Sequence, residues 1–405
     1  MNFIDGGVAA PIGFTTNGVL SGIKAGRTRP DTALIFSEKP CAAAGVFTKN
    51  KVQAECVKLS RRHVAGGSAQ AVIVNSGNAN ACTGEQGAQA ALRMAQSAAS
   101  QLHLQEGDVL VCSTGVIGQQ LPVEKIEAKM ADLVAGLSKE GHQLAREAIM
   151  TTDTRYKEAA LETTIGGRTV RLGTMAKGSG MIHINMGTML GFITTDCAIS
   201  AAMLDKALRE SVEETYNCVS VDGDTSTNDT LLILANGMAG NQVIDSEGAD
   251  YEAFLSALNQ LNRLMAKRIA ADGEGAEHLV ECRVDGAASV EDARILAKAV
   301  ISSNLVKAAF FGKDANWGRI LCAMGYSGGS FTPEKASVSF ASVAGGIQVF
   351  KEGVPLDFDE ELARRILSED ETCIEVELQD GNCSGTAWGC DLTYEYVKIN
   401  GDYRT

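Results

Sequence analysis

Apolar residues along the chain alternate between short continuous runs and helical spacings, and this pattern predicts an α/β fold. Residues 70–75 and 108–112 are short apolar runs that end in small polar residues, which is typical of buried strands. The alanine-rich segment 85–104 between them predicts a helix. Residues 122–137 begin with proline and carry apolar residues at helical spacing, which predicts a second helix.

The middle of the chain continues this alternation. Residues 161–175 contain a Gly-Gly pair between two strand-like runs, which predicts a hairpin. Residues 202–217 and 251–271 carry apolar residues at the spacing of amphipathic helices. The segment 230–235, T-L-L-I-L-A, lies between them and predicts a strong strand.

The last part of the chain is expected to contain mainly short strands. They start at Lys335, and one helix is expected near residues 360–368. The 405 residues contain no low-complexity linker and no repeat of fixed period. This length suits two or three domains or one composite fold, and the missing linkers favour one interwoven fold.

Composition and charge narrow the class of protein. Apolar residues make up 45% of the chain, which is ample for a buried core. The net charge of −14 argues against nucleic acid and anionic membranes as partners. The first residues lack the pattern of a signal peptide, and no apolar run is long enough to span a membrane. We therefore expect a cytoplasmic enzyme.

Cysteine and histidine spacing gives no sign of a metal site. The eleven cysteines are scattered and include no C-x-x-C pair, so we expect free, mostly buried thiols. The five histidines show no ligand spacing, and no phosphate-binding G-x-x-x-x-G-K motif occurs. We therefore expect no metal and no cofactor.

Two further motifs resemble known sites but fail in detail. Residues 325–329, G-Y-S-G-G, fit the G-x-S-x-G pattern, but such a hydrolase needs a later histidine and the last one is His278. Residues 222–229, D-G-D-T-S-T-N-D, suggest a calcium loop, but Ile233 stands where the closing glutamate should be. The preferred interpretation of residues 325–329 is a glycine turn. That of residues 222–229 is a capping or turn role.

The most distinctive chemistry lies in residues 177–188, K-G-S-G-M-I-H-I-N-M-G-T, where Thr188 directly follows Gly187. A break between these two residues would place the α-amine of Thr188 beside its own hydroxyl, which is a known way to activate threonine. Gly187 has no Cβ, so it leaves room for the hydroxyl to approach the preceding carbonyl. On local sequence alone, an ordinary strand entry is the favoured interpretation.

The whole segment resembles the processing site of the ornithine acetyltransferase family, also called glutamate N-acetyltransferases. Other motifs resemble that family in the same order along nearly the whole chain: N-S-G-N-A-N-A-C-T-G (75–84), S-T-G-V-I-G (113–118), T-T-D-T (151–154), D-G-E-G-A (272–276), K-D-A-N-W-G-R (313–319) and the terminal Y-V-K-I-N-G-D-Y-R-T. Two departures occur. Gly187 stands where alanine is common, and His183-Ile184 replaces a pair that often includes proline.

The resemblance implies a layered α/β fold shared with self-processing aminopeptidases. It implies a self-cleaved chain, with residues 1–187 as the α chain and 188–405 as the β chain, assembled as a heterotetramer of two α and two β chains. The implied reaction in arginine biosynthesis is ping-pong acetyl transfer from N-acetylornithine to glutamate through acetyl-Thr188. The resemblance also favours acetyl-CoA as a second acetyl donor.

Site residues follow from the same resemblance. The implied catalytic residues are Thr188, Thr114 and Gly115, with the last two stabilising the oxyanion. The implied substrate contacts are Thr151, Lys177, Thr188, Glu274, Asn400 and Thr405. In chemical terms, Glu274 can pair with a δ-ammonium and Lys177 with a substrate carboxylate.

Two other functions remain open from sequence. One is a self-processing aminopeptidase or amide hydrolase on the same fold, with water in place of glutamate as the acceptor. The other is an uncut small-molecule binding protein. The acetyl group would appear as free acetate in the first case, and the protein would run as one intact band in the second.

Overall fold

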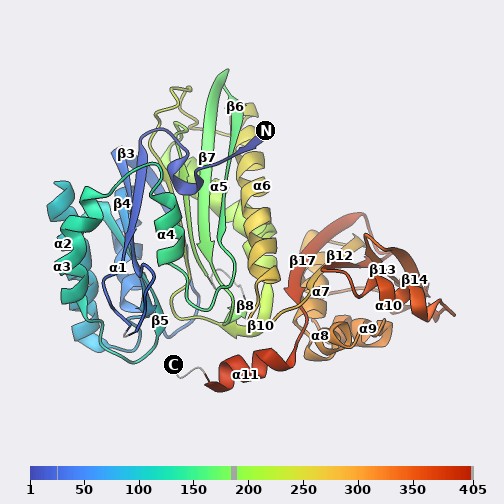
Figure 1. Cartoon of the computed structure of the whole chain (residues 1–405). Helices are drawn as coiled ribbons and strands as arrows, with labels where there is room; N and C mark the ends of the chain where they lie inside the picture. Colours follow the sequence, from blue (N-terminus) through green and yellow to red (C-terminus); the bar gives the residue numbers. More distant parts are fainter. Residues whose placement is uncertain (25, 184–188, 403–405) are drawn as a thin grey trace.

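The computed structural model describes residues 1–24, 26–183 and 189–402. Gly187, Thr188 and Thr405 therefore lie outside the described residues. The described chain forms a large α/β unit, then a smaller unit, and ends in a helix that returns toward the large unit (Figure 1).

A central sheet runs through the large unit. Within the described ranges it has nine strands, in the order β1-β6-β7-β9-β11-β3-β4-β5, and β2 pairs with β3 beside this path. The strands are β1 (Asn2–Ile4), β2 (Phe14–Val19), β3 (Thr32–Phe47), β4 (Ser68–Asn78), β5 (Val109–Val116), β6 (Lys157–Ile165), β7 (Arg168–Lys177), β9 (Leu190–Thr195) and β11 (Thr230–Ala235). Thus β9 and β11 lie between strands that precede residue 188, and the two parts of the chain share one sheet.

Helices cover both faces of this sheet (Figure 1). One layer contains α1 (Glu55–Val64), α2 (Gly84–Leu102), α3 (Val123–Ala135) and α4 (His142–Ala148), and the other contains α5 (Ala201–Glu214) and α6 (Ala249–Ala271). Alternate residues of β11 join the two cores. Leu231 and Ile233 pack in the core of α5 and α6, whereas Leu232 and Leu234 pack in the core of the other layer. Because both faces are buried, the strand is apolar from Leu231 to Ala235.

The smaller unit is built on a second sheet, which in the described chain has the order β15-β14-β13-β16-β12-β17. Its elements are β12 (Leu279–Ala287), α7 (Val290–Ser302), α8 (Asn304–Phe311), α9 (Trp317–Gly325), β13 (Ser337–Ser342), β14 (Gly345–Lys351), β15 (Val354–Pro355), α10 (Glu360–Ile366), β16 (Glu371–Glu377) and β17 (Cys383–Cys390). A separate pair joins β8 (Ile182–His183) to β10 (Ser220–Thr225). The final helix is α11 (Tyr394–Asp402).

The predicted layered α/β fold is confirmed. The predicted hairpin is β6 and β7, and both turn glycines, Gly166 and Gly167, adopt the positive φ that such a turn requires. The expectation of one helix after Lys335 is wrong, because α11 follows α10. None of the residues of α11 is buried, so no apolar stripe marked it in the sequence.

Two further expectations concern the cysteines and membrane-spanning helices. All eleven cysteines, which lie within the described residues, are free thiols, as predicted. Most are buried, but Cys82 and Cys322 are exposed. No helix in the described part of the chain is long and apolar enough to cross a membrane.

Candidate active site

A cavity of about 110 Å³ brings together predicted residues from segments far apart in the sequence. It lies where β5 and β7 end, beside the loop that follows α6 and beside α11. The predicted residues that line it are Thr114, Gly115, Thr151, Lys177, Glu274 and Asn400. The remaining predicted residues, Gly187, Thr188 and Thr405, lie outside the described residues.

The backbone at Thr114 and Gly115 is held against β4. Gly115 has a φ of 135°, and a Cβ on it would lie 2.3 Å from the carbonyl carbon of Gly77 on the neighbouring strand. Only glycine fits this close approach without a shift of the backbone. The preceding Ser113 hydroxyl donates to Asn75 Oδ1 at 2.6 Å in the buried interior. The N–H of Gly115 is therefore carried on a rigid segment, as an oxyanion donor requires.

Asn228 fixes the same segment from the other part of the chain. Its side-chain amide donates to the carbonyls of Ser113 at 2.7 Å and Ala79 at 2.6 Å. Its Oδ1 accepts from the Thr227 hydroxyl at 2.6 Å. Asn228 is buried and lines the cavity. Sequence reasoning missed this role, because an asparagine in a polar loop is most often a turn residue.

Lys177 brings a positive charge to the cavity although only 8% of its surface is exposed. Behind it, the Asp153 carboxylate accepts from the Gly178 N–H at 2.7 Å. Burial alone would raise the pKa of Asp153, but the ammonium groups of Lys177 and Lys157 outweigh burial and hold this pKa well below its usual value. Among the described residues, the ion pairs of Asp153 and Asp272 are made with Lys157 and not with Lys177.

A buried ion network lies beneath the cavity. Lys157, of which 1% is exposed, donates to Asp153 at 2.8 Å and also to Asp272. Asp272 in turn accepts from the backbone N–H of Thr154 at 3.1 Å. The network therefore ties the T-T-D-T segment to the D-G-E-G-A segment and explains why Asp153 and Asp272 are acidic. Lys157 was missed, because no motif distinguishes it from a surface lysine in a strand.

Glu274 places a negative charge in the same cavity as Lys177. The Asn400 side-chain amide donates to Glu274 Oε2 at 2.8 Å, and the Glu274 N–H donates to the Ser179 carbonyl at 3.1 Å. A Cβ on Gly180 would lie 2.2 Å from the Glu274 carboxyl carbon, so this glycine permits the close approach. Among the described residues that line it, the cavity therefore offers one cation and one anion, which suits a zwitterionic ligand.

Asp222 holds the backbone that leads to the predicted cleavage site. Its carboxylate accepts from the N–H groups of Met181 at 2.6 Å and Ile182 at 2.8 Å. Met181 has a φ of 57°, which is uncommon for a residue with a side chain. Burial raises the pKa of Asp222. The segment 222–229 caps no helix among the described residues: its first four residues belong to β10, and the Asn228 N–H donates to the Ser226 hydroxyl at 3.2 Å in the turn that follows.

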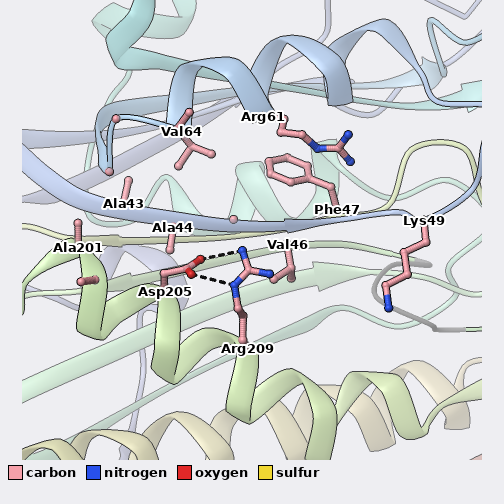
Figure 2. Close-up of a pocket in the computed structure, with 15 residues that line it drawn as sticks. Ala43, Ala44, Val46, Phe47, Lys49, Arg61, Val64, Ala201, Asp205 and Arg209 are labelled. Atoms are coloured by element: carbon pink, nitrogen blue, oxygen red, sulfur yellow. Dashed lines mark hydrogen bonds and ion pairs between the residues drawn. The ribbon is translucent and has the colours of Figure 1, made fainter. Parts of the chain in front are cut away.

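A second and larger cavity, of about 660 Å³, lies elsewhere on the large unit (Figure 2). It is lined by residues 43–47 of β3 and by parts of α1 and α5. Arg209 pairs with Asp205 along one wall at 2.8 and 3.0 Å, and Arg61 lies on the opposite side (Figure 2). None of the described residues that line it is a predicted site residue, so cavity size alone does not locate the site.

Comparisons with known proteins identify the family of the chain. The ArgJ family matches residues 15–405. The protein called "Arginine biosynthesis bifunctional protein ArgJ" in Symbiobacterium thermophilum is 53% identical over 406 residues, which cover 100% of each chain. A Clostridium acetobutylicum relative called "Arginine biosynthesis bifunctional protein ArgJ 1" is 51% identical over 392 residues, 97% of this chain and 96% of that protein.

One solved structure is also similar. A chain of the arginine biosynthesis bifunctional protein argJ from Bacillus halodurans is 46% identical, with a TM-score of 0.51. The match covers 53% of this chain and 100% of that chain. The predicted family resemblance is thereby confirmed, and the chain belongs to the ArgJ family.

Proposed function

We propose that the chain transfers an acetyl group from N-acetylornithine to glutamate and releases ornithine and N-acetylglutamate in arginine biosynthesis. Its relatives over the full length are named as bifunctional proteins of arginine biosynthesis, which supports an acyltransferase of this pathway. The observation that carries the proposal is the cavity in which Lys177, Glu274 and the Thr114-Gly115 segment meet.

The charges in this cavity match both amino acids of the reaction. Lys177 binds a substrate carboxylate, and Glu274 binds an ammonium group, including the δ-ammonium of ornithine. Asn400 orients Glu274 through its 2.8 Å hydrogen bond. Thr151, from the loop after α4, and Thr405 complete the proposed contacts.

Self-cleavage between Gly187 and Thr188 produces the nucleophile in this proposal. The Thr188 hydroxyl attacks the Gly187 carbonyl, and the peptide C–N bond breaks, which frees the α-amine and leaves an ester on Thr188. Water then hydrolyses this ester, which restores the Thr188 hydroxyl and leaves a carboxylate on Gly187. The solved Bacillus halodurans chain supports a divided protein, because the whole of it matches 53% of this chain. Residues 188–405 likewise make up just over half of the sequence.

The two fragments remain together because they share one core. Strands β9 and β11, which follow residue 188, lie between β7 and β3, which precede it. The buried pairing of Lys157 with Asp272 crosses the same boundary. We further propose that two α and two β chains assemble as a cytoplasmic heterotetramer. Light scattering should then give the mass of two 405-residue chains.

In the first half-reaction, Thr188 Oγ attacks the acetyl carbonyl of N-acetylornithine. The α-amine of Thr188 takes the hydroxyl proton and passes it to the leaving nitrogen as the C–N bond breaks; an unperturbed α-amine has a pKa of about 7.7–8.0. The Thr114 hydroxyl and the Gly115 N–H stabilise the oxyanion. Ornithine leaves, and the acetyl group remains as an ester on Thr188.

In the second half-reaction, the amine of glutamate attacks this ester. The N–C bond forms, the C–O bond breaks, and the Thr188 hydroxyl recovers its proton by way of the α-amine. The acetyl group is conserved, and this chemistry needs no cofactor. A thioester reacts by the same steps, so acetyl-CoA serves as a second donor; the word bifunctional in the names of the relatives agrees with two reactions.

Product analysis separates this proposal from a hydrolase on the same fold. Glutamate and N-acetylornithine labelled in its acetyl group should give labelled N-acetylglutamate, whereas a hydrolase would give labelled acetate. Acetate as the main product would overturn the proposal. A parallel reaction with glutamate and acetyl-CoA alone tests the second donor, with Thr188→Ala as the matched control.

A further inference from the structure

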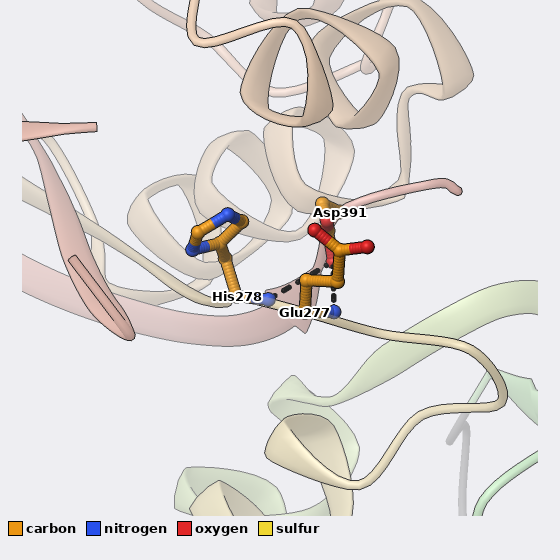
Figure 3. Close-up of side chains that lie close together, drawn as sticks. All are labelled: Glu277, His278 and Asp391. Carbon is orange, nitrogen blue, oxygen red and sulfur yellow. Dashed lines mark hydrogen bonds between the residues drawn. The ribbon is translucent and has the colours of Figure 1, made fainter. Parts of the chain in front are cut away.

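A cluster of three potential ligand side chains lies at the root of the C-terminal tail, outside the residues that line the proposed active site. Glu277 and His278 precede β12, and Asp391 follows β17 (Figure 3). One ligand atom from each lies within 4.8 Å of the others. The spacing of the histidines predicted no metal site, and no local pattern marks Asp391, which is 113 residues away from His278 in the chain.

The buried carboxylate of Asp391 is the first observation that points to a bound ligand. Only 3% of it is exposed, and its Oδ1 accepts from the N–H groups of Glu277 at 2.9 Å and His278 at 3.1 Å. Its Oδ2 is buried and has no hydrogen-bond partner among the described residues. A buried carboxylate oxygen without a partner is costly, and a bound cation would satisfy it.

His278 is the second reason. It is 7% exposed, and its Nδ1 lies 3.0 Å from the backbone carbonyl of Glu369. A carbonyl can only accept, so Nδ1 carries the hydrogen, and in the neutral imidazole the lone pair is then on Nε2. Metal-binding histidines are usually held in this way by a backbone carbonyl or a carboxylate.

We propose that Glu277, His278 and Asp391 bind one divalent transition-metal ion of the zinc class. One imidazole nitrogen and two carboxylate oxygens are ligands that Zn²⁺ accepts at about 2.0–2.2 Å, with water at the open position. Calcium and magnesium prefer ligands that are all oxygen. The side chain of Glu277 is exposed, so it can turn toward the ion and complete the coordination.

The charges around the cluster permit a metal ion to bind there. The nearby ammonium of Lys307 donates to the Cys390 carbonyl and makes no ion pair with Asp391 among the described residues.

The bound ion would fasten the tail to the loop that carries Glu274. It would join the chain just before β12 to the chain just after β17, and the Thr393 hydroxyl already donates to the Gly275 carbonyl at 2.7 Å beside it. Helix α11, which carries Asn400, begins at Tyr394, three residues after Asp391. The ion would thus set the position of α11 without touching the reacting atoms.

Isothermal titration with ZnCl₂ tests the proposal on the full-length protein after dialysis against a chelator. We expect one tight site per 405-residue chain, weakened on the order of 100-fold in His278→Asn and in Glu277→Gln. His63→Asn is the matched control, because His63 also faces a backbone carbonyl, that of Val109 at 2.8 Å, but has one carboxylate near it. No tight site, or a site unchanged in both cluster variants, would overturn the proposal.

Two further measurements test the ligands of the ion and its effect on the tail. Co²⁺ in place of Zn²⁺ should give a spectrum without thiolate charge-transfer bands, because no cysteine belongs to the cluster; strong bands would assign the ion to thiols such as Cys82 and overturn the proposal. Zn²⁺ should slow amide exchange in residues 394–402 of the wild type but not of His278→Asn, and equal exchange would overturn the fastening role. These measurements do not use acetyl transfer, so the metal site can fail its test without any effect on the proposed function.

Discussion

The side-chain amide of Asn400 donates to the carboxylate of Glu274 at 2.8 Å and thereby links the C-terminal helix to the proposed active site. This contact matters because none of the residues of α11 is buried. A helix with no buried face gains little from packing, so it depends on a few polar contacts. The tail of the chain is therefore placed to complete the cavity rather than to stabilise the fold.

Asn400→Ala should raise KM about tenfold or more and leave self-cleavage unchanged. The variant removes a hydrogen bond to a charged group, which is worth roughly 1.5–3 kcal/mol. Deletion of residues 400–405 should have a larger effect in the same direction. Initial rates of transfer with each substrate varied will measure it.

Lys398→Ala is the matched control, because Lys398 lies on the same helix and pairs only with Glu395 at 3.2 Å among the described residues. Its KM should stay close to that of the wild type. A tail deletion that retains full activity would show that α11 has no part in substrate binding.

Lys157→Met should destabilise the chain by about 3–5 kcal/mol, because it removes the ammonium that the buried carboxylates of Asp153 and Asp272 share. Urea unfolding should be followed in a Thr188→Ala background, so that the protein stays one chain and the comparison is not complicated by fragment dissociation.

Arg93→Met is the control for this measurement. Arg93 also pairs with a carboxylate, that of Glu127, but the pair is on the surface. Its loss should change the free energy of unfolding little, because exposed ion pairs contribute little to stability. An equal effect of the two substitutions would refute the buried network as a source of stability.

Thr114→Val should lower the rate of acetyl transfer by about 100- to 1,000-fold, because it removes one oxyanion donor while keeping a similar shape. Thr114→Ser keeps a hydroxyl and should retain most of the rate. Circular dichroism should be the same for both. A valine variant as fast as the serine variant would remove the Thr114 hydroxyl from the mechanism.

Much of the large unit was predictable because its elements are buried on the faces that the sequence pattern marks. The strand 230–235 was predicted with its observed bounds, since both of its faces lie in apolar cores. Helix α11 was not predicted, because its exposed residues carry no apolar stripe. The apolar pattern of a sequence reflects which residues are buried, so it does not predict a helix whose residues are exposed.

The candidate site was predictable in a different way. The family resemblance supplied Thr114, Lys177 and Glu274, for which local sequence favoured ordinary turns or surface charges. The residues behind them were missed. The pairing of Lys157 with Asp272 and that of Asn228 with Ser113 each join positions more than a hundred residues apart, which no local pattern records.

The purified protein should consist of two co-purifying fragments, residues 1–187 and 188–405. The reason is the proposed attack of the Thr188 hydroxyl on the Gly187 carbonyl. N-terminal sequencing of the second fragment should begin at Thr188, and Thr188→Ala should remain a single chain. A second fragment that begins at any other residue would disprove this cleavage site.

The acetyl-enzyme is the central claim, and mass spectrometry of the cleaved protein tests it most directly. Incubation with N-acetylornithine alone should add one acetyl group to the 188–405 fragment, and peptide mapping should place it on Thr188. Addition of glutamate should remove the group and yield N-acetylglutamate. A fragment that stays unmodified while transfer proceeds only with both substrates present would contradict the account and indicate direct transfer in a ternary complex.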